Sequence, residues 1–182
     1  FVVGLEIQQA LADRARRGVR LNQLASRVSI VQADVRYADA LFRPRLFDAV
    51  VSNPPYHEPG RGRISLQEEK ALSRHQLMMP INDLFRVSRT LLKPEGRLSF
   101  IYPAGAAARI REGMKEAGFK PACMLWIHPY ENADPCLLCV EARLDPWSQE
   151  TKEHSLVLYD GPGRRTLDAE TILAGEEVAL LE

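Results

Sequence analysis

The sequence predicts an α/β fold with a mainly parallel, doubly wound sheet. Short apolar runs alternate with segments of helical periodicity, and the connections between them are short. The run FDAVVS, residues 47–52, is apolar on both faces, as strands of buried parallel sheets are. Two further strands, expected at 122–128 and 136–142, are joined by a turn-rich segment too short for a crossover helix. We therefore expect these last two core strands to be antiparallel neighbours.

The other elements follow from periodicity and from helix-breaking residues. Gly118 closes one expected helix, and the KPEG segment ends another. One face of the first expected helix is apolar, which predicts that it packs on the sheet; its members are Ala10, Leu11, Ala15 and Val19. We expect additional strands at 1–5, 27–32, 97–102 and 156–159, and helices at 7–22, 81–92, 106–117 and from Asp168 onward.

Composition narrows the range of functions. The 182 residues suffice for one domain with a sizeable core, and 24 basic residues balance 24 acidic ones. A neutral chain has no global field that attracts a polyanion or a membrane surface. No apolar run approaches the roughly 20 residues of a membrane helix, and no signal-peptide pattern opens the chain. We expect no membrane partner, and the cytoplasm is the expected compartment.

The three cysteines do not predict a metal site. Cys136 and Cys139 form a C-x-x-C pattern inside an expected strand, where residues three apart point to opposite faces. Together with Cys123 they are interpreted as buried, reduced thiols, and no metal is expected.

The tetrapeptide Asn-Pro-Pro-Tyr, residues 53–56, directly follows the expected strand 47–52. In doubly wound sheets ligands bind beyond the carboxyl ends of strands. Two prolines hold this segment extended and remove N–H groups that would compete for its carbonyls. The Asn53 side-chain carbonyl and the Pro54 backbone carbonyl would each accept one N–H of a planar amino group, while Tyr56 stacks on its ring. We predict that Asn53, Pro54, Pro55 and Tyr56 are catalytic; a merely rigid turn is the alternative.

The stretch DAVVSNPPY resembles the signature of S-adenosylmethionine-dependent methyltransferases that methylate amino groups. The resemblance covers roughly residues 1–143 and implies a Rossmann-like class I methyltransferase domain there, followed by a C-terminal extension, residues 144–182, with a short strand and helix. It implies S-adenosyl-L-methionine as the cofactor. By this resemblance Glu6 holds the cofactor ribose, Asp34 and the Val35 backbone meet its adenine, and Ile7 and Asn53 are further cofactor contacts.

Residue patterns alone leave alternatives for the two acids. Glu6 can favour the first turn of a helix through the helix dipole. Asp34 can cap a helix or form a turn.

The resemblance extends to bacterial tRNA adenine-N6 methyltransferases that modify the anticodon region of a valine tRNA. They carry NPPY followed by PG, an arginine-rich loop and a histidine, comparable to HEPGRGR and SRHQ here. This implies tRNA as the substrate, and the residues expected to meet it are Tyr56, Arg61, Arg63 and Arg74. A solvated loop of mixed charge is the alternative for these arginines.

The glycine-rich motif of that family, which follows its first strand, is absent from the sequence. Since that strand lies between the family's second and fourth strands, runs 1–5 and 47–52 should not be neighbours in a continuous sheet. We expect that the sequence lacks an N-terminal piece with this first strand. Open alternatives are methylation of protein glutamine, guanine N2 in RNA or adenine in DNA, and a non-catalytic fragment with a binding role. The oligomeric state is left open.

Overall fold

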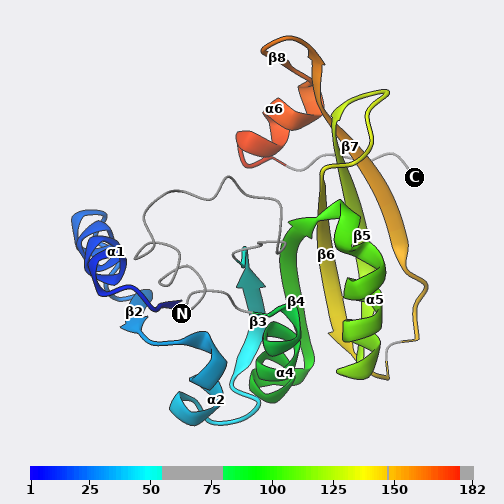
Figure 1. Cartoon of the computed structure of the whole chain (residues 1–182). Helices are drawn as coiled ribbons and strands as arrows, with labels where there is room; N and C mark the ends of the chain where they lie inside the picture. The colour runs from blue at the N-terminus through cyan, green and yellow to red at the C-terminus, as the bar shows by residue number, and fades with distance from the viewer. Residues whose placement is uncertain (55–79, 147, 177–182) are drawn as a thin grey trace, which may run out of the picture.

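The computed structural model describes residues 1–54, 80–146 and 148–176 (Figure 1). Its strands are β1 (Val2–Glu6), β2 (Val28–Gln32), β3 (Phe47–Ser52), β4 (Leu92–Pro103), β5 (Phe119–Tyr130), β6 (Leu137–Leu144), β7 (Lys152–Gly161) and β8 (Arg164–Arg165). Its helices are α1 (Gln9–Leu21), α2 (Ala38–Leu41), α4 (Ile81–Leu91), α5 (Ala107–Glu116) and α6 (Leu167–Leu173), with short 3₁₀ helices η1 (Val35–Tyr37) and η2 (Ala104–Ala106).

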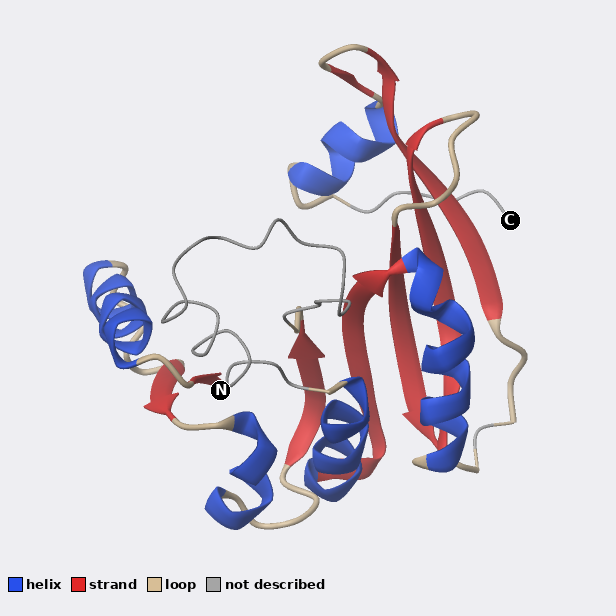
Figure 2. Ribbon diagram, in the orientation of Figure 1, coloured by secondary structure: helices blue, strands red, loops and turns tan. Residues whose placement is uncertain are grey.

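The strands of the described residues form two sheets (Figure 2). Strands β1 and β2 make a parallel pair. The larger sheet has the order β3-β4-β6-β5-β7-β8. Within it β3, β4, β5 and β7 run in one direction, whereas β6 and β8 run in the other. The predicted α/β fold is confirmed, and so is the antiparallel pairing of the strands expected at 122–128 and 136–142, which are β5 and β6.

Strands β1 and β3 are not neighbours, as the sequence predicts. They belong to different sheets, and β3 forms an edge of the larger one, where Val51 is 81% exposed. The two sheets are connected through η1, α2 and α4, where Ala38, Val87 and Leu91 form a small buried cluster against Leu5. A further strand between β1 and β3 remains a prediction.

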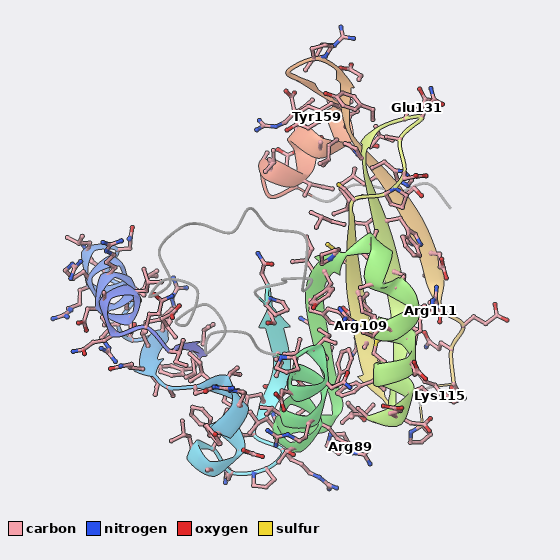
Figure 3. The ribbon with its side chains drawn as sticks, viewed as in Figure 1. Arg89, Arg109, Arg111, Lys115, Glu131 and Tyr159 are labelled. Carbon is pink, nitrogen blue, oxygen red and sulfur yellow. The ribbon has the colours of Figure 1, made fainter. Side chains whose placement is uncertain are left out.

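The main core lies between the larger sheet and the helices α4 and α5. Phe85 of α4 is fully buried, and its ring contacts Phe100 edge-on at 5.6 Å between centroids. The same ring lies 6.4 Å from that of Phe119. Arg89, labelled in Figure 3, extends from α4 to the end of α5, where its Nη1 donates to the Ala117 carbonyl at 2.7 Å. These contacts fix the helices against the strands that carry the candidate site.

One expectation about local structure was wrong. The apolar face predicted for α1 is largely exposed: Leu11 is 38% exposed, and in this helix only Ala12 is buried. The reason is that β1 and β2 form a sheet of two strands, which is too narrow to cover the helix. The KPEG segment does end the preceding helix, because α4 closes at Leu91. Its residues then form the bulged start of β4: Phe47 pairs with Leu92, and Ala49 already pairs with Arg97.

The segment after residue 143 continues the larger sheet. The strand expected at 156–159 is part of the ten-residue β7, which pairs in parallel with β5 from Cys123–Lys152 to Tyr130–Tyr159. Thr166 caps α6, with its hydroxyl accepting from the Ala169 N–H. The division between a domain at 1–143 and an extension at 144–182 stays a prediction. None of the described helices combines the length and the hydropathy needed to cross a lipid bilayer.

Candidate active site

Asn53 and Pro54 lie directly beyond the carboxyl end of β3, where the sequence predicts them. Ser52 ends the strand and pairs with Phe100 of β4. This pair fixes the position of Asn53 and Pro54 along the strand direction of the sheet. Pro54 is buried, whereas Asn53 is exposed. A buried proline next to an exposed amide anchors the backbone and leaves the amide available to a ligand. Pro55 and Tyr56, and the predicted RNA contacts Arg61, Arg63 and Arg74, lie outside the described residues.

The acid of the DAVVSNPPY stretch, Asp48, lies near the opposite end of β3. It forms an ion pair with Lys93 from the bulge of β4, and this bond holds the pKa of the carboxyl below its usual value. Five residues of strand separate Asp48 from Asn53, a rise of about 16 Å. Asp48 therefore helps to dock β3 on β4 and does not face the predicted acceptor.

Glu6 ends β1, and its carboxylate already has one partner. Its Oε1 accepts from the Gln8 backbone N–H at 2.8 Å, next to the start of α1. This is the helix-start role that the residue pattern allows. An ionised carboxylate has about four lone-pair positions, so it has the capacity to accept from a pair of sugar hydroxyls as well. Ile7, the next residue, is 38% exposed.

Asp34 follows β2 and caps η1. Its Oδ1 accepts from the Arg36 backbone N–H at 2.9 Å, and its Oδ2 from Arg36 Nε at 2.8 Å. The hydrogen bond from the Arg36 side chain is the main cause of a lowered Asp34 pKa. Asp34 is thus the capping residue of η1, and its contact with a cofactor stays a prediction. Val35 packs partly buried against both core clusters.

The structure brings the two acids together and leaves Asn53 on another sheet. Glu6 pairs with Gln32 across the strands, and the Ala33 N–H donates to the Glu6 carbonyl at 3.1 Å. Glu6 and Asp34 therefore lie at the carboxyl ends of adjacent strands. Asn53 follows β3, the edge strand of the larger sheet.

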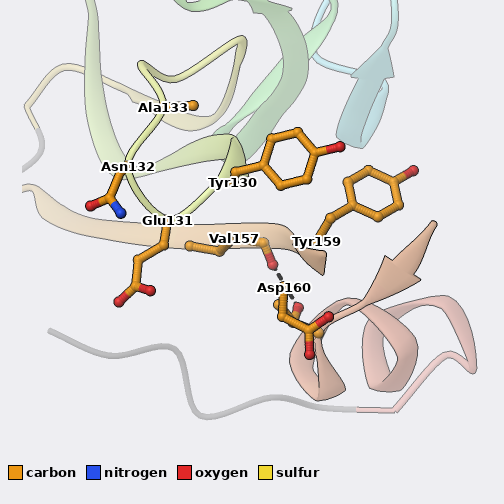
Figure 4. A pocket seen from close by; sticks show the side chains of 8 residues that line it. Tyr130, Glu131, Asn132, Ala133, Val157, Tyr159 and Asp160 are labelled. Carbon is orange, nitrogen blue, oxygen red and sulfur yellow. Dashed lines mark hydrogen bonds between the residues drawn. The ribbon is translucent and has the colours of Figure 1, made fainter. Parts of the chain in front are cut away.

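Sequence reasoning missed a cleft at the far end of β5 and β7. It has a volume of about 600 Å³ and lies beside the rings of Tyr130 and Tyr159 (Figure 4). Each tyrosine ends or nearly ends its strand, and the two pair in the parallel ladder. The two tyrosines are far apart in the sequence. They meet only because β7 pairs with β5, and local sequence patterns do not predict that pairing.

The cysteines are all free thiols. Burial raises the pKa of Cys123 and of Cys139, which keeps both protonated, whereas Cys136 is exposed just before β6. Among the described residues no group of three or more histidine, cysteine or acidic side chains is arranged to hold a metal ion.

The fold is similar to solved methyltransferase structures. The sequence matches no protein-family model. Solved structures do match: a predicted O-methyltransferase from Agrobacterium tumefaciens superposes with a TM-score of 0.71 at 21% identity, covering 97% of this chain and 78% of that one. The methyltransferase subunit of a type I restriction-modification system from Streptococcus thermophilus gives 0.62 at 18% identity, over 97% and 42% of the two chains. The fold is that of class I methyltransferases.

Curated relatives share one function. A tRNA1(Val) (adenine(37)-N6)-methyltransferase from Aliivibrio fischeri is 28% identical over 159 residues, which are 87% of this chain and 65% of that protein. The enzyme of the same name from Bacteroides thetaiotaomicron is also 28% identical, over 87% and 71% of the two chains. The chain thus resembles tRNA adenine-N6 methyltransferases, and it spans about two thirds of the length of these relatives.

Proposed function

We propose that this chain carries the methyl-acceptor site of an S-adenosyl-L-methionine-dependent N-methyltransferase that acts on adenine N6 in tRNA. The observation that carries the proposal is the position of Asn53 and Pro54. They lie beyond the carboxyl end of a sheet strand, with the proline buried and the amide exposed, in a fold shared with class I methyltransferases. Relatives named as tRNA adenine methyltransferases support the choice of acceptor.

The chemistry of an aromatic amino group explains what these residues do. The nitrogen is a poor nucleophile, because its lone pair is delocalised into the ring. The Asn53 amide oxygen and the Pro54 carbonyl each accept one N–H, which orients the nitrogen and stabilises the charge that develops on it. Proline at position 54 adds no N–H of its own that would compete for the amino group. Tyr56 stacks on the base in this proposal.

The described residues offer a partial fit to the cofactor, which supplies an electrophilic methyl group when bound. Glu6 fits the ribose, because it lies at a strand end and retains acceptor capacity beyond its bond to Gln8. Asp34 fits the adenine less well, since Arg36 already occupies both of its oxygens. We propose Ile7 and the Val35 backbone as flanking contacts.

A tRNA substrate implies further proposals about context. The cytoplasm is the compartment we propose, because bacterial tRNA is modified there. Arg61, Arg63 and Arg74 are proposed to meet RNA phosphates. We propose no metal in the reaction, since the methyl group is already activated by the sulfonium charge of the cofactor.

The experiment measures methyl transfer from labelled S-adenosylmethionine to a valine-tRNA transcript. Two proteins are compared: this chain, and a version extended at its N-terminus by a glycine-rich segment of the kind that the family resemblance implies. Isothermal titration with S-adenosylmethionine runs in parallel. We expect the extended version to bind the cofactor and to label adenine N6.

Acceptors of other classes test the alternatives in the same assay. A DNA duplex, a tRNA whose target adenine is replaced by guanine, and a glutamine-containing peptide should remain unlabelled. Labelling of the peptide or of DNA in preference to tRNA would contradict the proposed substrate. Absence of cofactor binding by both proteins would favour a non-catalytic binding role.

A further inference from the structure

The cleft beside Tyr130 and Tyr159 lies at the same edge of the sheet as Asn53. Strands β3, β4, β5 and β7 run in one direction, so their carboxyl ends point to one side of the molecule. Ser52, the last residue of β3, is level with Met124 of β5 through the pairs Phe100–Val140 and Val140–Met124. Tyr130 is six residues further along, so β5 projects about 20 Å beyond that level. The cleft therefore lies on the same side of the sheet as Asn53, further along the strand direction.

Two aromatic rings form one wall of the cleft. Their centroids lie 5.9 Å apart, and the planes are inclined by 43° (Figure 4). Tyr130 is 47% exposed, so much of its ring is available to a ligand, and Tyr159 supports it from the neighbouring strand. Exposed tyrosine faces of this kind are the surfaces on which unpaired nucleobases stack.

The polar groups of the cleft suit a base edge and not a phosphate. Glu131, Asn132 and Asp160 line it, and Asp160 is paired with Arg164 at 2.7 Å. Carboxylates repel a phosphate but accept hydrogen bonds from the amino group of cytosine or adenine, while an asparagine amide both donates and accepts. Arg164 and Arg165 lie next to the cleft on β8, exposed, where the backbone of the same nucleic acid would run.

The walls of the cleft are fixed by hydrogen bonds within the chain, so little ordering is needed on binding. The Ala133 N–H donates to the Tyr130 carbonyl at 3.0 Å, and the His128 ring bonds the Ala133 carbonyl at 2.8 Å. On the other wall Thr166 donates its hydroxyl to the Val157 carbonyl at 2.6 Å. A preformed site costs less conformational entropy to occupy.

We propose that this cleft is a second RNA subsite, in which Tyr130 and Tyr159 stack an unpaired nucleobase of the same RNA as the target adenine, and Glu131 with Asn132 selects bases that bear an exocyclic amino group. The subsite rests on the proposed function, since it assumes an RNA substrate. Its distance from Asn53 assigns it to a base some nucleotides away from the methylated one.

The test measures binding of labelled single-stranded oligo(C), oligo(U) and a matched duplex to the whole chain by fluorescence anisotropy, without cofactor. We expect oligo(C) to bind more tightly than oligo(U), because both are pyrimidines and only cytosine has the amino group. The duplex, whose bases are stacked internally, should bind most weakly. Tyr130→Ala should weaken oligo(C) binding about 5- to 150-fold, the range for loss of one stacked base.

Matched variants separate stacking from folding. Tyr130→Phe and Tyr159→Phe keep the rings and should bind within about 3-fold of the parent. Tyr37→Ala removes a tyrosine that is 65% exposed on η1, away from the cleft, and should have no effect. Glu131→Gln should reduce the preference for oligo(C) over oligo(U). Thermal unfolding of each variant checks that the fold persists.

Failure of this subsite is distinguishable from failure of the proposed function. Unchanged oligo(C) affinity in folded Tyr130→Ala and Tyr130→Ala/Tyr159→Ala variants would overturn the subsite, even if methyl transfer to tRNA is observed. Equal affinity for oligo(C) and oligo(U) would overturn the amino-group selection. Binding of a peptide ligand at the tyrosines, with no RNA binding, would also overturn it. Because binding is measured without cofactor, an inactive chain still gives a decisive result.

Discussion

Asn53 directly follows β3 and Tyr130 ends β5, two strands that run in the same direction in one sheet, three strand positions apart. At about 4.8 Å per position the lateral separation of these strands is about 14 Å. An exposed amide suited to hold an amino group and an exposed aromatic ring suited to stack a base therefore share one edge. A substrate that reaches both has to be extended along it, as an unpaired RNA loop is.

Gly118 adopts a conformation that glycine favours, and replacing it should destabilise the fold. Its φ is +73°, and a Cβ there would lie 2.5 Å from Arg89 Nη1, which donates to the Ala117 carbonyl. We expect Gly118→Ala to cost about 1–2 kcal/mol from the left-handed backbone, plus a smaller amount from the displaced hydrogen bond. Urea unfolding measures the difference in unfolding free energy.

Gly163 provides the control for this substitution. Its φ is +72°, but nothing lies within 4 Å of an added Cβ. Gly163→Ala should show the backbone cost alone. In an Arg89→Ala background the two glycine substitutions should cost the same; a persistent excess at Gly118 would show that Arg89 is not the obstacle.

Replacing Ser88 by alanine should stabilise the fold. The serine side chain is buried at 1% exposure, and its hydroxyl has no hydrogen-bond partner among the described residues. Since an unsatisfied buried hydroxyl costs about 1–3 kcal/mol, Ser88→Ala should raise the unfolding free energy by about 1 kcal/mol. Thr171→Ala, which removes a hydroxyl that donates to the Leu167 carbonyl at 2.8 Å, should give no such gain. A less stable Ser88→Ala protein would reveal a partner for the hydroxyl.

Glu153 should make the stability depend on acid pH. It accepts from Trp126 Nε1 at 3.0 Å and from Arg111 Nη2 at 2.6 Å. The hydrogen bond from Trp126, followed by that from Arg111, lowers its pKa. A lowered pKa means that the contribution is fully present above the ordinary glutamate value of about 4.3 and is lost as the pH falls through the lower folded-state value.

The measurement compares the parent with Glu153→Gln by urea unfolding, from neutral pH down to acid pH. Because the side chains of Arg111 and Glu153 are about half exposed, the parent should be more stable than the variant by less than about 1 kcal/mol at neutral pH. The difference should vanish at the acid end. Glu112→Gln is the control variant, because it also removes one negative charge from the surface. A difference that grows as the pH falls would mean that Glu153 is stabilised in its protonated form.

Local pattern was sufficient for much of the fold. Three features follow from properties of neighbouring residues. The strand FDAVVS follows from a short apolar run, the end of α5 from a left-handed glycine, and the antiparallel β5–β6 pair from a short turn. The position of Asn53 at a strand end follows in the same way, because a proline pair ends a strand.

Long-range pairing was what the pattern did not contain. The insertion of β6 between β4 and β5, and the parallel addition of β7, depend on contacts between remote segments. The tyrosine pair was missed for that reason, since Tyr130 and Tyr159 meet only when β7 joins β5. The exposure of Leu11 likewise depends on the width of the sheet beneath α1, which its own periodicity does not report.

If Asn53 holds the acceptor amino group, loss of its side chain should stop methyl transfer without preventing cofactor binding. Methyl transfer to valine tRNA and S-adenosylmethionine affinity are both measured for Asn53→Ala in the N-terminally extended protein. We expect the rate to fall by at least about 10²–10³, the usual loss for one group that stabilises developing charge, with cofactor affinity within a few-fold of the parent. Near-normal turnover in Asn53→Ala would contradict the account.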